Sequence, residues 1–151
     1  MKKSTKFIIA LLVTVGALAI TYRVVNQAPS KDLAADAQMQ EIITSGGCLQ
    51  CHSGSPDLPF YANWPVASGM VQKDVTQGYR AFDMTEMAEA LKAGKPVGKV
   101  ALAKVEKVIM DGTMPKHAYY MVHWGSSVTD AKKEMAMAWV KQHRLAHYAN
   151  G

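Results

Sequence analysis

The stretch GGCLQCHSG, residues 46–54, holds both cysteines of the chain and a histidine directly after the second cysteine. Three kinds of site use two thiols at this spacing: a redox-active dithiol, half of a zinc site, and the covalent attachment of a haem. A structural disulfide is a fourth interpretation, but it gives no role to His52. The residues around the motif therefore have to distinguish these chemistries.

Haem attachment is the interpretation that uses all three side chains. A redox dithiol normally opens a helix beside a βαβ unit, and no strand pattern flanks this motif. A zinc site needs about four ligands, and the chain has no second pair of cysteines. In a C-x-x-C-H motif, the thiols of Cys48 and Cys51 bond to the porphyrin and His52 becomes the proximal iron ligand. The sequence therefore predicts one covalently attached haem c.

The first 28 residues read as an export segment with a short linker. Three lysines precede an uncharged apolar run from Phe7 to Tyr22, and Arg23 follows it. A basic head before an apolar stretch is typical of a signal peptide, and Ala17-Leu18-Ala19 suits a signal peptidase. Apolar character continues to Val25, which also suits a membrane anchor of about 20 residues. Either way, we expect residues 29–151 in the periplasm, free or anchored at the inner membrane.

The positive net charge of +5 belongs mostly to this N-terminal segment. Four of the 17 basic residues lie within the first 23 positions, whereas all 12 acidic residues come later. The remainder is close to neutral, and nucleic-acid-binding domains usually have a clustered basic surface. We therefore expect no nucleic-acid partner.

Residues 29–151 are predicted to form a single all-α domain. The expected helices run from a cap at Ser30 or Asp32 to about Thr44, over about 84–93 after Asp83, over about 99–111, and from Ser127 or Thr129 to at least His143. The segment 53–82 has little periodicity, which predicts a long loop wrapped around a bound group or serving a site. The oligomeric state is not indicated.

Met114 is the strongest candidate for the second axial ligand. It lies in Gly112-Thr-Met-Pro115, where a glycine ends a helix and the proline favours an extended conformation at Met114. A thioether ligand opposite histidine raises the reduction potential of the iron. Most buried methionines only fill the core, however. The rival ligands are His117, His123, Met70 and Met84.

These features resemble a bacterial haem-binding domain family, similar to class I cytochromes c and also found fused to di-haem cytochrome c peroxidases. The resemblance covers about residues 35–142 and includes Pro59-Phe60-Tyr61, Tyr119 or Tyr120, His123 and Trp139. Phe60 stands where the family is expected to have tryptophan. The resemblance implies thioether bonds at Cys48 and Cys51, with His52 as the proximal and Met114 as the distal iron ligand.

Aromatic residues and one arginine complete the candidate site. Tyr61 and Trp64 are expected to cover the cofactor, and Arg80 to pair with a haem propionate. With both axial positions filled, the iron has no place for substrate, so we expect an electron carrier that serves redox partner proteins rather than an enzyme. The alternative is a ligand-sensing or peroxidase-associated haem protein with an open or labile distal position.

Overall fold

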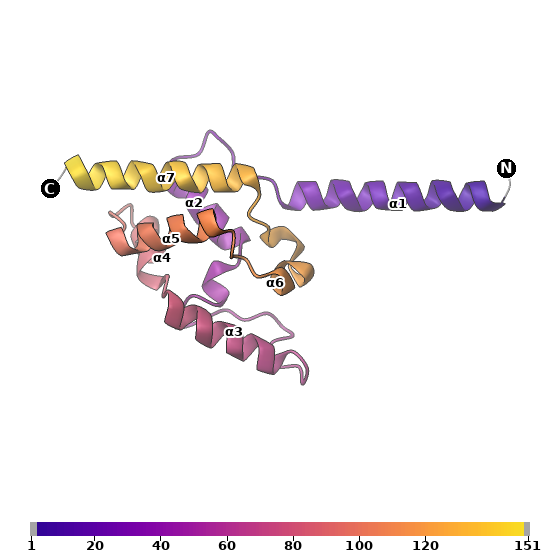
Figure 1. Cartoon of the computed structure of the whole chain (residues 1–151), viewed down its shortest axis with the longest axis horizontal. Helices are drawn as coiled ribbons and strands as arrows, with labels where there is room; N and C mark the ends of the chain where they lie inside the picture. Colours follow the sequence, from indigo (N-terminus) through magenta and orange to yellow (C-terminus); the bar gives the residue numbers. More distant parts are fainter. Residues whose placement is uncertain (1–2, 150–151) are drawn as a thin grey trace.

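Every regular element in the computed structural model, which describes residues 3–149, is helical. This confirms the predicted all-α fold, and the chain folds back on itself in a compact group of helices with one long helix outside it (Figure 1). The α-helices are α1 (Lys3–Val25), α2 (Ala35–Ser45), α3 (Ser68–Ala81), α4 (Thr85–Lys92), α5 (Lys99–Asp111), α6 (His117–Val122) and α7 (Asp130–Ala149), joined by the 3-10 turns η1 (Cys48–Gln50) and η2 (Trp124–Ser126).

Helix α1 projects away from the other helices, and only its C-terminal end meets them (Figure 1). It has 23 residues, a mean hydropathy of 2.2 over its most apolar window, and no buried residue. At 1.5 Å per residue it is about 35 Å long, enough to cross the hydrocarbon core of a bilayer. Length and composition therefore suit either a signal sequence or a membrane span.

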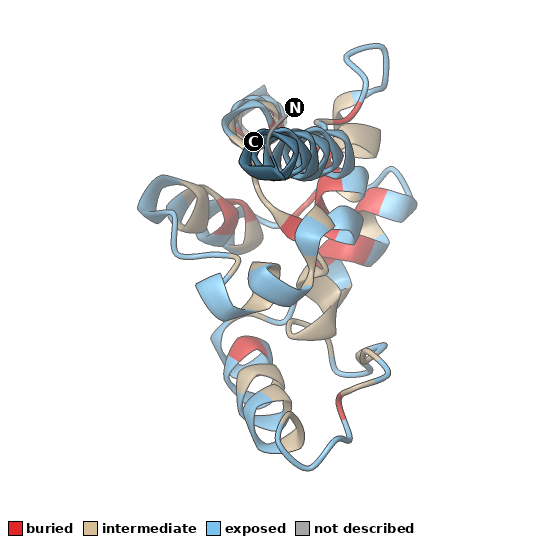
Figure 2. Cartoon of the chain, turned by 90° about the vertical axis from the view of Figure 1, so that its right-hand side faces the viewer, coloured by how far each residue is buried: buried red, intermediate tan, exposed pale blue. Residues whose placement is uncertain are grey.

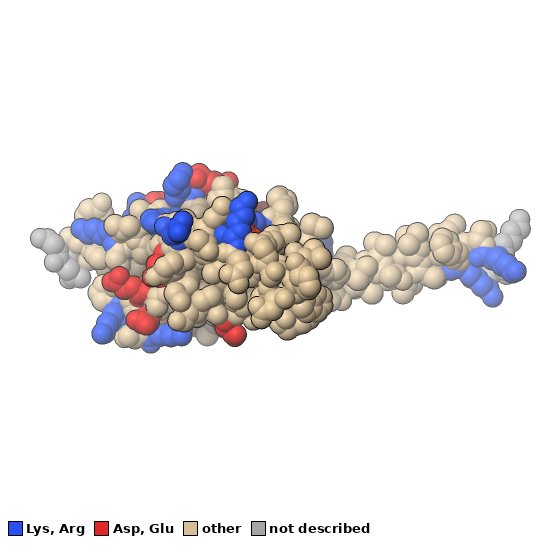
Figure 3. All heavy atoms as spheres, turned by 90° about the horizontal axis from the view of Figure 1, so that it is seen from below, with Lys and Arg blue, Asp and Glu red and all other residues tan. Residues whose placement is uncertain are grey.

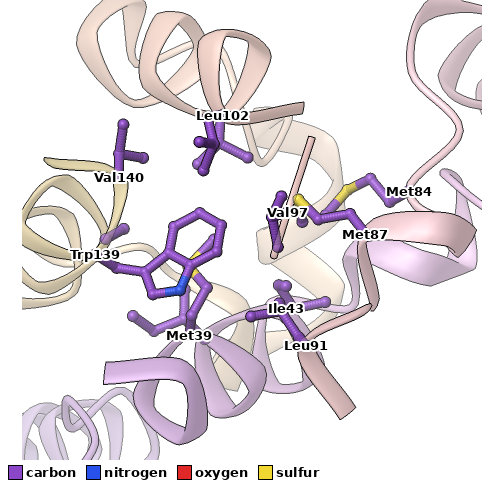
Figure 4. Packing of buried hydrophobic residues seen from close by; sticks show 12 residues of the cluster. Met39, Ile43, Met84, Met87, Leu91, Val97, Leu102, Trp139 and Val140 are labelled. Carbon is purple, nitrogen blue, oxygen red and sulfur yellow. The ribbon is translucent and has the colours of Figure 1, made fainter. Parts of the chain in front are cut away.

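The hydrophobic core lies between α2, α4, α5 and α7. Trp139 of α7 is at its centre, 1% exposed, with Met39 and Leu102 close to its ring (Figure 4). The indole N–H of Trp139 donates to the Asp36 carboxylate at 2.7 Å, so the one polar group of this side chain is satisfied. This core supports the segments that carry the candidate site.

Two of the predicted helix boundaries are confirmed by their glycines. Helix α2 stops before Gly46-Gly47, and Gly47 has a φ of 63°. Gly112 ends α5 with a φ of 61°, a left-handed conformation that glycine adopts without steric cost. The chain therefore turns sharply just before the cysteine motif and again just before Met114.

The predicted cap of α2 was wrong. The helix begins at Ala35, and no N-cap side chain accepts a hydrogen bond from the N–H groups of its first turn. Ser30 and Asp32 bond to each other instead, with the Asp32 N–H donating to the Ser30 hydroxyl at 3.2 Å. Because Ser30 and Asp32 hydrogen-bond to each other in a turn, neither of them caps the helix, and its N-terminus lies later in the chain.

The prediction of one long loop over residues 53–82 was also wrong. Only its first part is irregular, and α3 occupies the second. Helix α3 buries a single residue, Gly78, and most of its surface is exposed or intermediate (Figure 2). Val71, Val75 and Tyr79 recur at every fourth position along it, a helical pattern that the prediction of a loop did not take into account.

Candidate functional site

His52 is held by two hydrogen bonds to the segment between α3 and α4. Its Nδ1 donates to the Phe82 carbonyl oxygen at 2.8 Å, and the Met84 N–H donates to the His52 carbonyl oxygen at 2.7 Å. A carbonyl only accepts, so the Nδ1 atom carries the proton and Nε2 keeps its lone pair. Among residues 3–149, Nε2 has no hydrogen-bond partner. This is how metal-binding imidazoles are typically oriented.

Cys48 and Cys51 are half-buried and do not form a disulfide. Burial raises the pKa of the Cys48 thiol to about 11, and burial together with the charge of Asp74 raises that of Cys51. Redox-active C-x-x-C pairs and metal-bound thiolates need the opposite shift. The described residues also contain no group of three or more metal-binding side chains. Dithiol exchange and a zinc site are therefore disfavoured.

Helix α3 packs directly on the motif through Gly78. A Cβ atom at position 78 would lie 2.5 Å from the Cys51 carbonyl oxygen and 3.0 Å from the Cys51 Cβ atom. Glycine is therefore required where the helix meets the motif. Hydrophobic periodicity does not reveal this contact, and the isolated glycine was the only sequence signal for it.

Tyr119 of α6 covers the other side of the motif. Its hydroxyl donates to the Gln50 side-chain oxygen at 2.6 Å. The same hydroxyl oxygen would be only 1.9 Å from a Cβ atom placed on Gly47, so only glycine leaves room for it. Burial raises the pKa of Tyr119 to about 12, so the hydroxyl stays protonated at neutral pH. The turn that carries the cysteine motif and α6 therefore pack closely against each other.

His123 extends this contact to the loop before α3. Its ring stacks on Tyr119 with centroids 4.0 Å apart, and its Nδ1 donates to the Tyr119 carbonyl oxygen at 3.1 Å. The Tyr61 hydroxyl then donates to His123 Nε2 at 3.1 Å. Tyr61 and His123, both chosen from the sequence, therefore lie together. Since both ring nitrogens of His123 are engaged, this histidine is less suited to bind iron.

Met114 lies on the loop between α5 and α6, and the chain that follows it is tied to the site. Two residues later, Lys116 forms an ion pair with Asp74 of α3 at 2.6 Å. Asp74 is one helical turn from Gly78, which contacts Cys51. Further along, Tyr119 bonds to the motif as described. The chain after Met114 is therefore bonded both to α3 and to the cysteine motif, and Met114 itself is 36% exposed.

Comparison with known proteins agrees with this arrangement. The model of a family described as "Haem-binding domain" matches residues 7–142, which is most of the chain. The chain belongs to this haem-binding domain family. The match begins within α1, earlier than the start near residue 35 that the sequence motifs indicated.

This haem-binding domain is also similar to part of a larger enzyme. It is 36% identical over 104 residues to the cytochrome c peroxidase Ccp of Escherichia coli (strain K12). The alignment covers 69% of this chain and 22% of that protein, so the chain matches about a fifth of its relative. No solved structure matches the chain. The comparison supports a haem protein related to a cytochrome and does not show an enzyme.

The structure separates the rival ligands of the haem-binding domain. Met84 is buried in the hydrophobic core with Met87 (Figure 4), and Met70 is exposed near the start of α3. His117, at the start of α6, pairs with the Tyr120 hydroxyl and is exposed. Met114 lies on a loop that Lys116 and Tyr119 tie to α3 and to the cysteine motif from its C-terminal side, and it stays the predicted ligand.

The remaining predicted site residues differ in their surroundings. Trp64 and Phe60 form an edge-to-face aromatic cluster with Tyr61, with ring centroids 5.5 to 6.4 Å apart, and both are largely exposed. Such apolar surface beside the motif fits a cover for a porphyrin. Arg80 lies exposed near the end of α3, two residues after Gly78. It stays a prediction as a propionate partner.

Proposed function

We propose that this domain is a mono-haem c-type cytochrome of the periplasmic side of the inner membrane that transfers electrons. Haem c supplies an iron that cycles between Fe(II) and Fe(III). In this proposal Cys48 and Cys51 would carry the thioether bonds, and His52 and Met114 would be the iron ligands. The observation that carries it is the bond from His52 Nδ1 to the Phe82 carbonyl, which leaves Nε2 free as a ligand.

The surrounding residues support an electron carrier rather than a catalyst. The His52 bond to a backbone carbonyl fixes the ring and makes Nε2 a better donor. Methionine as the opposite ligand favours Fe(II) and raises the reduction potential. His123, a candidate for acid–base chemistry, is engaged on both ring nitrogens by Tyr119 and Tyr61. Partners are then other redox proteins.

The covalent attachment is tested by mass and colour. The full chain is produced in a bacterial host with the cytochrome c maturation system, purified, and denatured before mass spectrometry. We expect the mass of one haem added to the polypeptide, and its loss in the Cys48→Ala, Cys51→Ala double variant. A colourless wild-type protein with the bare polypeptide mass contradicts the proposal.

The axial pair is tested by the near-infrared spectrum of the oxidised protein, where iron–methionine bonding gives a weak diagnostic band. Met114→Ala should abolish the band, whereas Met70→Ala is a matched control that should retain it. Persistence of the band in Met114→Ala would show that another residue is the ligand. The N-terminal mass of the same preparation reports whether α1 is retained as an anchor.

A second candidate function follows from the similarity to a peroxidase. A haem protein that shares 36% identity with a fifth of such an enzyme fits a module that passes electrons to a peroxidase, or one with a labile Met114 that binds a small ligand. Carbon monoxide separates these roles. Rapid binding to the reduced wild-type protein indicates an open or labile site, whereas resistance indicates a carrier.

A further inference from the structure

Three apolar side chains at the end of α6 and the start of η2 are exposed together. Met121 is 73% exposed, Val122 65% and Trp124 46%. We call these three residues the α6–η2 patch. None of them takes part in the contacts that hold the cysteine motif, so the candidate haem site gives no reason for their apolar character.

The position of the patch relative to α1 is fixed by Asn26. This side chain is only 3% exposed; its amide N–H group donates to the Trp124 carbonyl oxygen at 2.6 Å, and its carbonyl accepts the Ser127 N–H at 2.9 Å. The Tyr22 hydroxyl adds a bond of 2.8 Å to the Ser127 hydroxyl. The last turn of α1 is therefore bonded to both ends of η2, and the patch adjoins it.

This arrangement places the patch at the membrane surface if α1 spans the bilayer. Figure 1 shows α6, η2 and the loop before α3 at the margin of the domain that faces along α1. In Figure 3 the part of the domain next to α1 shows almost no acidic or basic residues on the face seen there, whereas charged groups gather farther away. Tryptophan and tyrosine are enriched at the level of lipid headgroups, which is where Trp124 and Tyr22 would lie.

We infer that the α6–η2 patch docks on the lipid surface of the membrane that α1 spans. This inference rests on the anchoring in the proposed function, and it adds a fixed orientation to it. The side of the domain with α6, which follows the Met114 loop, then faces the bilayer, while the beginning of α5 points to the aqueous phase. Because the patch is uncharged, docking depends on apolar insertion and does not require anionic lipid.

Photolabelling from the lipid tests this directly. The full-length haem-loaded protein is placed in vesicles of phosphatidylethanolamine and phosphatidylglycerol that contain a phosphatidylcholine with a diazirine close to the headgroup. After irradiation, peptides are quantified by mass spectrometry. We expect labelling in α1 and in residues 117–127, and little labelling at Val100, which is 70% exposed at the distant start of α5.

A matched pair of variants gives a second readout. The double variant Met121→Gln, Val122→Gln should lower labelling of residues 117–127 by about tenfold. Each substitution removes apolar surface, roughly that of a few methylenes, which would otherwise be buried in the lipid, and this weakens docking. Val100→Gln should not change it. All three positions are exposed, so the fold is expected to persist, and an unchanged visible spectrum confirms this.

The outcomes separate the two proposals. Labelling confined to α1, with residues 117–127 no stronger than residues 99–111, overturns the docking while the anchoring stands; the patch would then be free for a protein partner. Absence of label from α1 overturns the anchoring and the docking together.

Discussion

Gly78 of α3 lies against the backbone of Cys51, so closely that a Cβ atom on Gly78 would be 2.5 Å from the Cys51 carbonyl oxygen. The atoms in the way belong to the main chain of the cysteine motif, which cannot move aside without shifting His52 as well. The contact thus couples the position of α3 to the geometry of the candidate haem site.

Gly78→Ala should destabilise the domain by about 1–3 kcal/mol, the usual cost of forcing extra atoms into a packed contact. Gly69→Ala in the same helix is the control, because nothing lies within 4 Å of a Cβ atom there. That variant should be neutral or slightly stabilising, as alanine favours helix by up to about 1 kcal/mol over glycine. Equal free energies of unfolding in urea for both variants would contradict the contact.

Tyr119→Phe tests the bond to Gln50 and its dependence on pH. Loss of the hydrogen bond should cost about 1 kcal/mol at pH 7. The folded protein raises the pKa of Tyr119 to about 12 from its ordinary value of 10, so the fold favours the protonated hydroxyl. The stabilisation is therefore complete below pH 10 and is lost as the pH rises toward 12.

The measurement is the difference in unfolding free energy between wild type and Tyr119→Phe across this pH range. It should shrink above pH 10. A difference that stays constant to pH 12 would show that the hydroxyl has its ordinary pKa and is not buried against the motif.

Sequence reasoning succeeded where a periodic feature specifies the structure: α5 was predicted from 99 to 111 because its apolar positions recur on one face. The motif from Cys48 to His52 indicated a haem protein, which the family match supports, and the attachment through these residues stays a prediction. Helix α3 was missed although Val71, Val75 and Tyr79 recur at helical spacing, and its contact with the motif depends on a missing side chain, at Gly78. The short α6 was missed as well, since none of its residues is buried.

The network around the motif could not be predicted either. Tyr119, Gln50 and Tyr61 come from three separate parts of the chain, and only the fold brings them together with His123. The double glycine at 46–47 was read as a helix stop. Its second role, leaving room for the Tyr119 hydroxyl, follows from long-range packing that local propensity does not describe.

Lys132 of α7 is buried, and no carboxylate among residues 3–149 pairs with it. Its ammonium group donates to the Ser127 carbonyl at 3.1 Å and to the Ser45 hydroxyl at 3.4 Å, both neutral acceptors. Burial lowers the pKa of Lys132, so the folded state binds this proton less tightly than the unfolded chain does. At neutral pH the charge therefore costs stability, and the cost falls as the pH rises toward the ordinary lysine value of 10.5.

Lys132→Met should consequently be neutral or stabilising at pH 7, because well-packed apolar replacements of buried charges often are. The wild type should gain on the variant between pH 7 and 10, as thermal unfolding of both proteins at several pH values will show. Strong destabilisation by Lys132→Met at pH 7 would mean that the two hydrogen bonds outweigh the cost of burying the charge.

Asn26→Ala should loosen α1 from the rest of the domain. The side chain satisfies both the Trp124 carbonyl and the Ser127 N–H, and its removal leaves two backbone groups unpaired near the end of α1. A loss of about 2–3 kcal/mol in local stability is expected for such a pair. Hydrogen exchange of the full chain in detergent micelles measures it: the amides of residues 124–127 should exchange faster in Asn26→Ala.

Tyr22→Phe, which removes one exposed bond to Ser127, is the control and should have a small effect. Equal protection of these amides in wild type and Asn26→Ala would show that α1 is not held through Asn26, and that its direction relative to the haem site is free.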